Sequence, residues 1–201
     1  MNGKAQGRAA WTNGLGPIVA ITASFFPWAL LLWLEGRRAF CACGFSVWSG
    51  DTCSASNSQQ LFDPYSFTHV LHGFFLFWLV TLIARTVVPR WQRSSAWQLW
   101  LALTLEATWE VLENTRFVID RYRAETAALG YTGDTIVNSF GDITCAVVGF
   151  LVARQLGVTR AVIVFLVLEV ILAVWIHDSL LLQLLMLVHP VTVIKHWQLC
   201  P

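Results

Sequence analysis

The sequence predicts an all-α fold, a polytopic membrane helix bundle with about five transmembrane helices in one domain. Of its 201 residues, 56% are hydrophobic and 12% are charged, about half the charged fraction of a soluble domain. The apolar residues gather in long blocks, and the 11 tryptophans suit a chain that crosses lipid–water interfaces. The formal net charge of +1 and the lack of a basic run argue against nucleic acid as a partner.

Five apolar blocks approach the length of about 20 residues that a membrane-spanning helix needs. They cover residues 16–34, 66–84, 96–112, 135–153 and 160–176. The first block is long and lacks a small-residue cleavage site, so we expect a retained helix rather than a signal peptide. A further apolar stretch, 180–194, is interrupted by His189 and Pro190. It fits a re-entrant segment, an interfacial helix or a poor sixth span, and the sequence leaves these alternatives open.

The positive charges predict an orientation in the cell inner membrane, because cytoplasmic connections carry an excess of Lys and Arg. Five spans place seven of the 13 Lys and Arg on one side, which we assign to the cytoplasm: Lys4, Arg8, Arg85, Arg90, Arg93, Arg154 and Arg160. The other six, Arg37, Arg38, Arg116, Arg121, Arg123 and Lys195, lie opposite. Residues 1–15 would then be a cytoplasmic tail and 35–65 a periplasmic loop.

The predicted periplasmic loop contains Cys41, Cys43 and Cys53. In an oxidising compartment we expect a disulfide from Cys53 to one of the other two. The spacing of the three does not match a zinc site.

Polar side chains that are costly in a membrane fall at one predicted depth. The acidic residues are unevenly spread, because seven of the 12 fall within residues 106–142: Glu106, Glu110, Glu113, Asp120, Glu125, Asp134 and Asp142. The three glutamates of the third block share one helix face, as do His69 and His72 on the second block. Asp134, Asn138 and Asp142 recur every four residues along the fourth block, and His177 and Asp178 end the fifth. The second and fourth helices begin, and the third and fifth end, at the same side, so these groups are expected to meet.

The connection between the third and fourth blocks has the pattern of a helix followed by a turn. Arg116, Arg121 and Arg123 would pair with Asp120 and Glu125 or receive the anionic head group of a lipid. Thr132 or Asp134 would cap the fourth helix.

The shared depth favours a binding or catalytic site over interhelical polar contacts alone. Unequal carboxylates can serve as acid and base, and we expect Asp142 to pair with Glu110, or His72 with Glu113. The catalytic candidates are Glu110, Glu113, His72, Asp134 and Asp142, and the substrate-binding candidates are His69, Asn114, Arg121, Arg123, Tyr131 and Asn138. The composition also resembles a metal site, but the Glu-x-x-His pair of di-iron proteins and the His-Glu-x-x-His motif are missing. Metal content and cofactors therefore stay open.

Several segments resemble a known family. They are Phe62-Asp-Pro-Tyr-Ser-Phe-Thr-His-Val-Leu-His-Gly73, Trp109-Glu-Val-Leu-Glu-Asn114, Ile119-Asp-Arg-Tyr-Arg123 and Gly133-Asp-Thr-Ile-Val-Asn-Ser139. The chain is similar over about residues 60–198 to domain of unknown function 2585, also called uncharacterised protein family 0314, which occurs mainly in alphaproteobacteria. This resemblance implies a multi-pass inner-membrane protein and no particular activity. The chain has Thr115-Arg-Phe117 where the family commonly has Ser-Pro-Phe, and His177 where it has Arg.

A shorter likeness is to VanZ-like proteins, through Glu110-x-x-Glu113 and Asp134-x-x-x-Asn138. It implies a link to envelope lipids or cell-wall precursors.

The leading hypothesis is thus a periplasm-facing pocket that binds or processes an envelope lipid or lipid-linked precursor, with membrane lipid as the partner. The alternative is a non-enzymatic accessory subunit or assembly factor of a larger membrane complex, whose polar cluster would be structural or would hold an ion or cofactor. Whether the protein is an enzyme stays open.

Overall fold

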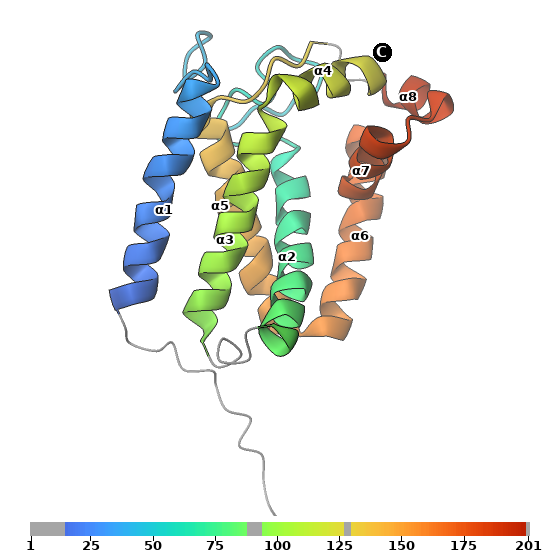
Figure 1. The fold of residues 1–201 in the computed structure, drawn as a ribbon. Coiled ribbons are helices and arrows are strands. Elements are labelled where there is room, and N and C mark those ends of the chain that lie inside the picture. The colour runs from blue at the N-terminus through green and yellow to red at the C-terminus, as the bar shows by residue number, and fades with distance from the viewer. Residues whose placement is uncertain (1–14, 88–93, 127–129, 200–201) are drawn as a thin grey trace, which may run out of the picture.

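The computed structural model describes residues 15–87, 94–126 and 130–199, and within these ranges the regular structure is entirely helical. Five long helices run side by side: α1 (Leu15–Leu34), α2 (Ser66–Thr86), α3 (Ser95–Glu113), α5 (Ile136–Leu156) and α6 (Val158–Ile176) (Figure 1). Three short helices, α4 (Arg116–Glu125), α7 (Leu180–Val188) and α8 (Thr192–Gln198), lie toward one end. The predicted all-α bundle is confirmed, and each apolar block matches one long helix to within a few residues.

The outer surface of the bundle is apolar enough for a membrane. Helices α2, α5 and α6 are each long and apolar enough to cross one, and Val19–Leu34 of α1 is a shorter apolar helix. Helix α6 exposes Ile163, Val170 and Val174 by 58%, 63% and 74%. Exposed apolar surface on this scale marks contact with lipid or protein rather than water.

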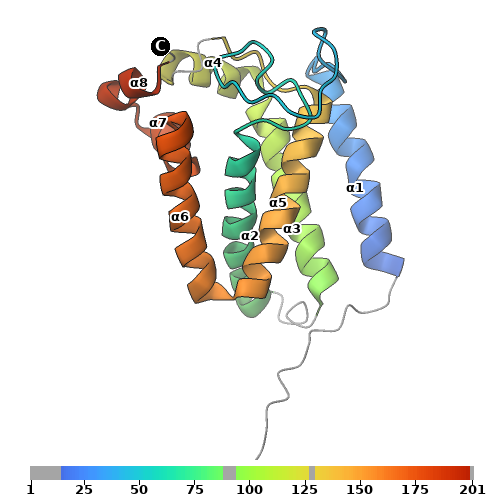
Figure 2. The same ribbon diagram turned by 180° about the vertical axis from the view of Figure 1, so that it is seen from behind.

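Helices α2 and α5 form the centre of the bundle because glycines let their backbones touch. A Cβ added at Gly73 of α2 would lie 2.1 Å from the carbonyl oxygen of Ala146, and one at Gly149 of α5 would lie 2.0 Å from that of Val70. Small residues of this kind allow close helix packing in membranes. Helix α1 packs on α3 on one side of this pair and α6 packs on the other (Figure 2).

The ends of four helices meet where the sequence places them. Helices α2 and α5 begin, and α3 and α6 end, at the end of the bundle that α4 and the loop 35–65 cover. The N-cap of α5 is Thr135, whose hydroxyl accepts from the Asn138 amide at 3.2 Å. The predicted cap, Thr132 or Asp134, is therefore wrong, and Asp134 precedes the helix instead of lying in its first turns.

Two further expectations are corrected. Cys41 and Cys43 form a disulfide with each other, so the predicted bridge from Cys53 to one of them is wrong. Residues 180–194 are not a sixth span, because the break at His189 leaves α7 with 9 residues and α8 with 7. Helices of this size are about 10–14 Å long, whereas the hydrocarbon core is about 30 Å thick.

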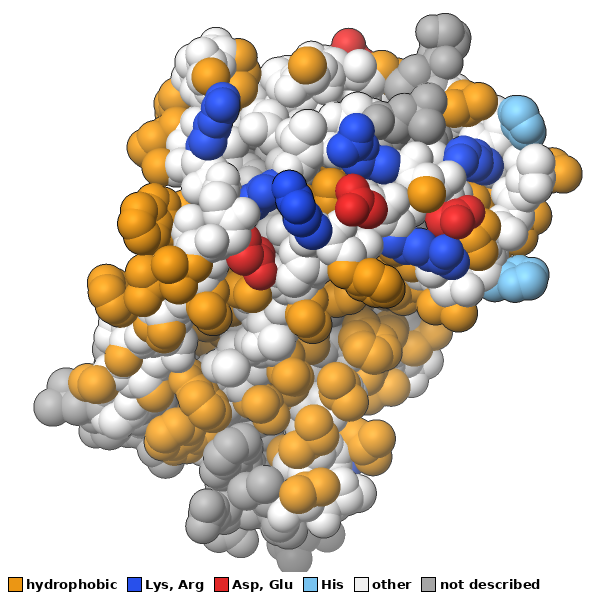
Figure 3. All heavy atoms as spheres, turned by 45° about the horizontal axis from the view of Figure 1, so that its top comes forward, with side chains coloured by type: hydrophobic (Ala, Val, Ile, Leu, Met, Phe, Trp, Pro, Cys, Tyr) orange, Lys and Arg blue, Asp and Glu red, His pale blue; other side chains and the backbone are white. Residues whose placement is uncertain are grey.

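Charged side chains gather on the end face that α4 covers (Figure 3). The six Lys and Arg assigned to the non-cytoplasmic side lie in segments at this end, and Arg85, Arg154 and Arg160 lie toward the other. The remaining cations of the predicted cytoplasmic side, Lys4, Arg8, Arg90 and Arg93, lie outside the described residues. The orientation thus stays a prediction.

Candidate functional site

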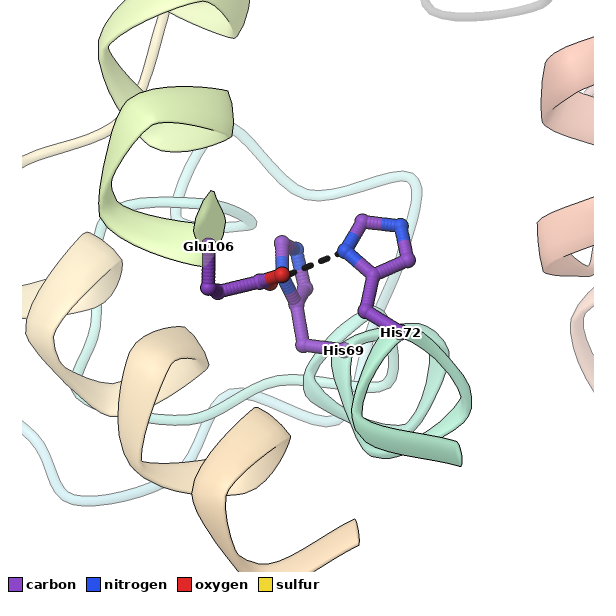
Figure 4. Close-up of side chains that lie close together, drawn as sticks. All are labelled: His69, His72 and Glu106. Atoms are coloured by element: carbon purple, nitrogen blue, oxygen red, sulfur yellow. Dashed lines mark hydrogen bonds and ion pairs between the residues drawn. The ribbon is translucent and has the colours of Figure 1, made fainter. Parts of the chain in front are cut away.

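A buried carboxylate–imidazole cluster joins α2 and α3. His69 and His72 extend from α2 toward Glu106 of α3 (Figure 4). The Nδ1 atoms of the two rings lie 2.7 Å and 2.9 Å from the same Glu106 oxygen, Oε1. An ionised carboxylate only accepts hydrogen bonds, so both rings present an N–H at Nδ1. Sequence reasoning placed Glu106 on the right helix face but left it out of the candidate residues.

Glu110 and Asp142 extend the cluster to α5. The Glu110 side chain is fully buried, and neither of its oxygens has a hydrogen-bond partner. Its Oε1 lies 3.3 Å from His69 Nδ1, but the single hydrogen on that nitrogen serves the shorter contact to Glu106. Asp142 Oδ2 lies 3.9 Å from His69 Nε2, and its Oδ1 accepts from the Ser66 hydroxyl at 2.8 Å. Asp142 and Glu110 lie close together, as expected. One oxygen of each lies within 4.8 Å of a His69 nitrogen, and these two oxygens lie within 4.8 Å of one another.

Glu113 lies one turn beyond Glu110 and has a different partner from the one expected. It is hydrogen-bonded to Tyr122 of α4, and His72 pairs with Glu106 instead. Helix α4 therefore packs its tyrosine onto the end of α3. The predicted acidic face of α3 is real, but its members contact different elements.

A second polar group holds Asp134 at the entrance to α5. The Asp134 amide donates to Asn114 Oδ1 at 2.7 Å, and Asn114 Nδ2 donates to Asp134 Oδ2 at 2.9 Å. The Tyr131 hydroxyl donates to the same carboxylate at 3.0 Å. Burial raises the pKa of Asp134 to about 6, although the hydrogen bonds from Asn114 and Tyr131 act in the opposite direction.

Asn138 and the missed residue Asp63 tie the loop 35–65 to this end of the bundle. Asp63 accepts from the Ser58 amide at 2.8 Å and from Asn138 Nδ2 at 3.3 Å. Its other oxygen accepts from the Tyr65 amide at 2.8 Å, just before α2 begins. An acidic residue in front of an apolar block is a helix-start signal, which could have identified Asp63.

These groups surround a cavity of about 600 Å³ at the covered end of the bundle. Its lining includes His69, Glu113, Tyr122, Tyr131, Asp134, Asp142, Trp175, His177 and Asp178. Asp178 accepts from the Ser179 amide at 2.8 Å and from Gln198 Nε2 at 2.9 Å. Burial raises the pKa of Asp178 to about 7. The volume is in the range of small-molecule sites.

The other predicted site residues lie behind or outside this cavity. Glu110, His72, Asn114 and Asn138 support side chains that line it but are not part of the lining. Arg121 donates from Nε to the Leu187 carbonyl and pairs with Glu125 at 3.2 Å. Arg123 is exposed. The structure thus joins the carboxylates and histidines and keeps both arginines on the end face.

Fold and site together define a class: an all-helical protein with helices apolar enough to cross a membrane and a buried cluster of carboxylates and imidazoles at one end. Residues 32–200 match the family described as "Protein of unknown function (DUF2585)". The chain belongs to this family, as the sequence motifs predict, and the match begins nearer the N-terminus than they indicate.

Relatives called UPF0314 proteins support this assignment. The chain is 41% identical to one from Brucella anthropi over 189 residues, which cover 94% of this chain and 91% of the relative. It is 42% identical to one from Rhizobium meliloti, over 82% of this chain and 81% of that protein. It is 38% identical to one from Paracoccus denitrificans, over 84% of each. No solved structure matches the chain.

Proposed function

We propose that this is a multi-pass inner-membrane protein whose cavity binds, and whose carboxylates process, the head group of an envelope lipid or lipid-linked precursor. The observation that carries the proposal is the position of the cavity. It contains ionisable side chains of α2, α3 and α5 at the level where the apolar helices end. Ionisable residues within membrane segments indicate a functional site.

An aromatic group supports placing this level at the lipid–water interface. Trp175, which lines the cavity, is 49% exposed. Its ring packs edge-on against Phe67 with centroids 5.7 Å apart, and Phe67 packs in the same way on Trp48 at 6.3 Å. Tryptophan favours the head-group region of a bilayer. The lining next to Trp175 belongs to α6, whose outer face is apolar, which supports entry of a lipid from the side.

The cavity chemistry indicates what the head group contributes. Asp134, Asp142 and Asp178 offer carboxylate oxygens, which accept hydrogen bonds. They suit a head group with several hydroxyls or an amine, such as a sugar or an ethanolamine. Phosphate groups of the same lipid would meet Arg121 and Arg123 on the end face, as the sequence-based assignment of these residues to anion binding implies.

A processing step is supported by the protonation behaviour of Asp134. A carboxyl group with a pKa of about 6 can hold a proton in part of the molecules near neutral pH and exchange it with a substrate. General acid–base catalysis is most efficient when the pKa of the group lies near the working pH. Asp134 is therefore the residue that we assign to proton transfer, and Asn114 and Tyr131 position it.

The test is the native lipid content of the full chain, purified in nanodiscs from its own membrane and measured by native mass spectrometry. We expect a bound lipid that Asp134→Asn and Asp142→Asn reduce several-fold. The matched control is Glu169→Gln, since Glu169 is also buried but accepts from the Leu181 amide near the start of α7, away from the cavity lining. Equal lipid in all four proteins would refute the proposal. A stoichiometric partner protein without bound lipid would favour the accessory-subunit alternative.

A further inference from the structure

We infer that His69, Glu110 and Asp142 bind one divalent transition-metal ion at the inner end of the cavity. The three residues come from three helices, α2, α3 and α5, and are all buried. One possible ligand atom from each lies within 4.8 Å of the others. Metal–ligand bonds of about 2.1 Å bring ligand atoms to within about 4.2 Å of each other, so small side-chain shifts would complete the site.

The Glu110 carboxylate provides independent support. It is 0% exposed, and both of its oxygens lack a hydrogen-bond partner. A buried polar group without a partner costs about 1–3 kcal/mol, and more when it is charged. By contrast, the neighbouring carboxylates of Glu106 and Asp142 have hydrogen bonds at 2.7 Å and 2.8 Å. A cation bound by Glu110 would remove this imbalance.

The orientation of His69 is the one that metal-binding histidines adopt. Its Nδ1–H donates to Glu106, so the lone pair is on Nε2, the nitrogen that faces Asp142 at 3.9 Å. Glu110 Oε1 lies 3.3 Å from Nδ1, so the Glu110 carboxylate would have to turn toward Nε2 to join the site. Histidine ligands usually donate their other ring N–H to a carboxylate, which fixes the ring and its tautomer. Glu106 has this second role, and the additional hydrogen bond from His72 at 2.9 Å holds it in place.

The charge of the cluster also calls for a cation. Glu106, Glu110 and Asp142 place three carboxylates next to two imidazoles in the interior of the helices. Among residues 15–87, 94–126 and 130–199, no Lys or Arg forms an ion pair with any of these three carboxylates. Within these ranges, the ion pair between an Arg and an acidic residue is Arg121–Glu125, on the end face. Ionised carboxylates without a cationic partner are expensive at this depth, and a divalent ion would compensate two such charges.

The donor atoms select the class of ion. One imidazole nitrogen with two carboxylates suits Zn²⁺, Mn²⁺ or Fe²⁺, whereas Ca²⁺ and Mg²⁺ favour sites of oxygen alone. His69 and Asp142 line the cavity and Glu110 lies behind them. The ion would thus keep a coordination position open toward the cavity, where a head-group oxygen or a water can bind. This part of the inference rests on the proposed function; the ion site itself does not.

The experiment measures metal in the full chain, purified in nanodiscs, after equilibration with Zn²⁺ or Mn²⁺ and removal of free ion by dialysis. We expect about one equivalent of metal per chain in the wild type, at least 10-fold weaker binding in Glu110→Gln and Asp142→Asn, and wild-type binding in Glu169→Gln. His177, His189 and His196 are present in all four proteins, so metal held only by them would be equal in all four.

Two results would overturn the inference: no metal above the level of empty nanodiscs in the wild type, or metal that Glu110→Gln does not reduce. A rise in the wild-type thermal midpoint on adding Zn²⁺ or Mn²⁺, reduced in Asp142→Asn, is a second measurement that does not need Glu110→Gln to fold. Lipid measured on the same samples separates the two proposals. Lipid without metal would refute only the ion site, and metal without lipid only the proposed function.

Discussion

Gly73→Ala is the substitution that tests most directly whether the α2–α5 contact builds the site. The new Cβ would lie 2.1 Å from the Ala146 carbonyl oxygen, whereas real Cβ contacts stay beyond 3.0 Å. The obstacle is backbone, so α2 and α5 would have to separate by about 0.9 Å, the difference between these two distances. Such a shift would lengthen the Ser66–Asp142 hydrogen bond from 2.8 Å to about 3.7 Å, beyond hydrogen-bonding range.

Two opposing effects decide the energy of this change. Alanine favours a helix over glycine by about 1 kcal/mol. Overpacking costs about 1–3 kcal/mol, and a lost hydrogen bond to a charged group costs about 1.5–3 kcal/mol more. The two costs together are larger than the gain, and we expect Gly73→Ala to lower the free energy of unfolding by about 1.5–5 kcal/mol.

The assay is reversible unfolding in detergent micelles, with lipid and metal content measured on the same protein. Gly16→Ala is the matched control, since a Cβ at Gly16 of α1 would meet nothing nearer than a Trp97 ring atom at 4.0 Å. We expect Gly16→Ala to keep wild-type ligand content and to keep or raise stability, by up to about 1 kcal/mol. A Gly73→Ala protein within about 0.5 kcal/mol of wild type, a size typical of neutral substitutions, would refute the reasoning.

Three further predictions follow from the same contacts. The pKa of Asp178 is raised to about 7 by burial, above its unfolded value of about 3.9. The contribution of this carboxyl group to stability is therefore full below pH 4 and is lost as the pH rises through 7. The thermal midpoint of Asp178→Asn should therefore rise relative to that of the wild type from pH 5 to pH 8. The same difference in thermal midpoint at pH 5 and pH 8 would contradict this. Asn114→Ala removes two hydrogen bonds to Asp134 of 2.7 Å and 2.9 Å and should cost about 2–4 kcal/mol, with bound lipid reduced, as unfolding and lipid analysis would show. Glu125→Gln breaks the half-exposed pair with Arg121 and should change stability by less than about 1 kcal/mol; a larger loss would mean that α4 depends on this pair.

The sequence predicts the helices well because the signal is one of length and hydropathy. Each long helix corresponds to a continuous apolar block, and a block of that size has few alternatives to a helix. The shared depth of His69, Glu110 and Asp142 follows in turn from the alternation of helix directions. The close contact of α2 and α5 at Gly73 and Gly149 is not among the predictions, because no sequence pattern says which backbone a glycine meets.

The rest of the site depends on contacts that the sequence pattern does not contain. Asp63 reaches Asn138 across 75 positions of the chain, and no periodicity links a loop residue to a helix so far away. Asp134 fits the four-residue spacing of α5, but the Thr135 hydroxyl caps the helix one position later. His72 pairs with Glu106 rather than Glu113, and α4 supplies Tyr122 to the latter. For Asp63 and His72 the partner is chosen by tertiary packing.

The tight contact of α2 and α5 also limits what can balance the buried acids. Gly73 and Gly149 bring the two backbones together beside the cluster, so the space between His69 and Asp142 is a single side-chain contact of 3.9 Å. A lysine or arginine side chain does not fit into such a gap, whereas a metal ion or a proton does. Proton sharing between Glu110 and Asp142 would leave the protein without bound metal and insensitive to added Zn²⁺. A bound ion would instead give metal content and thermal stability that change together when either acid is replaced, because both properties would depend on the same ligands.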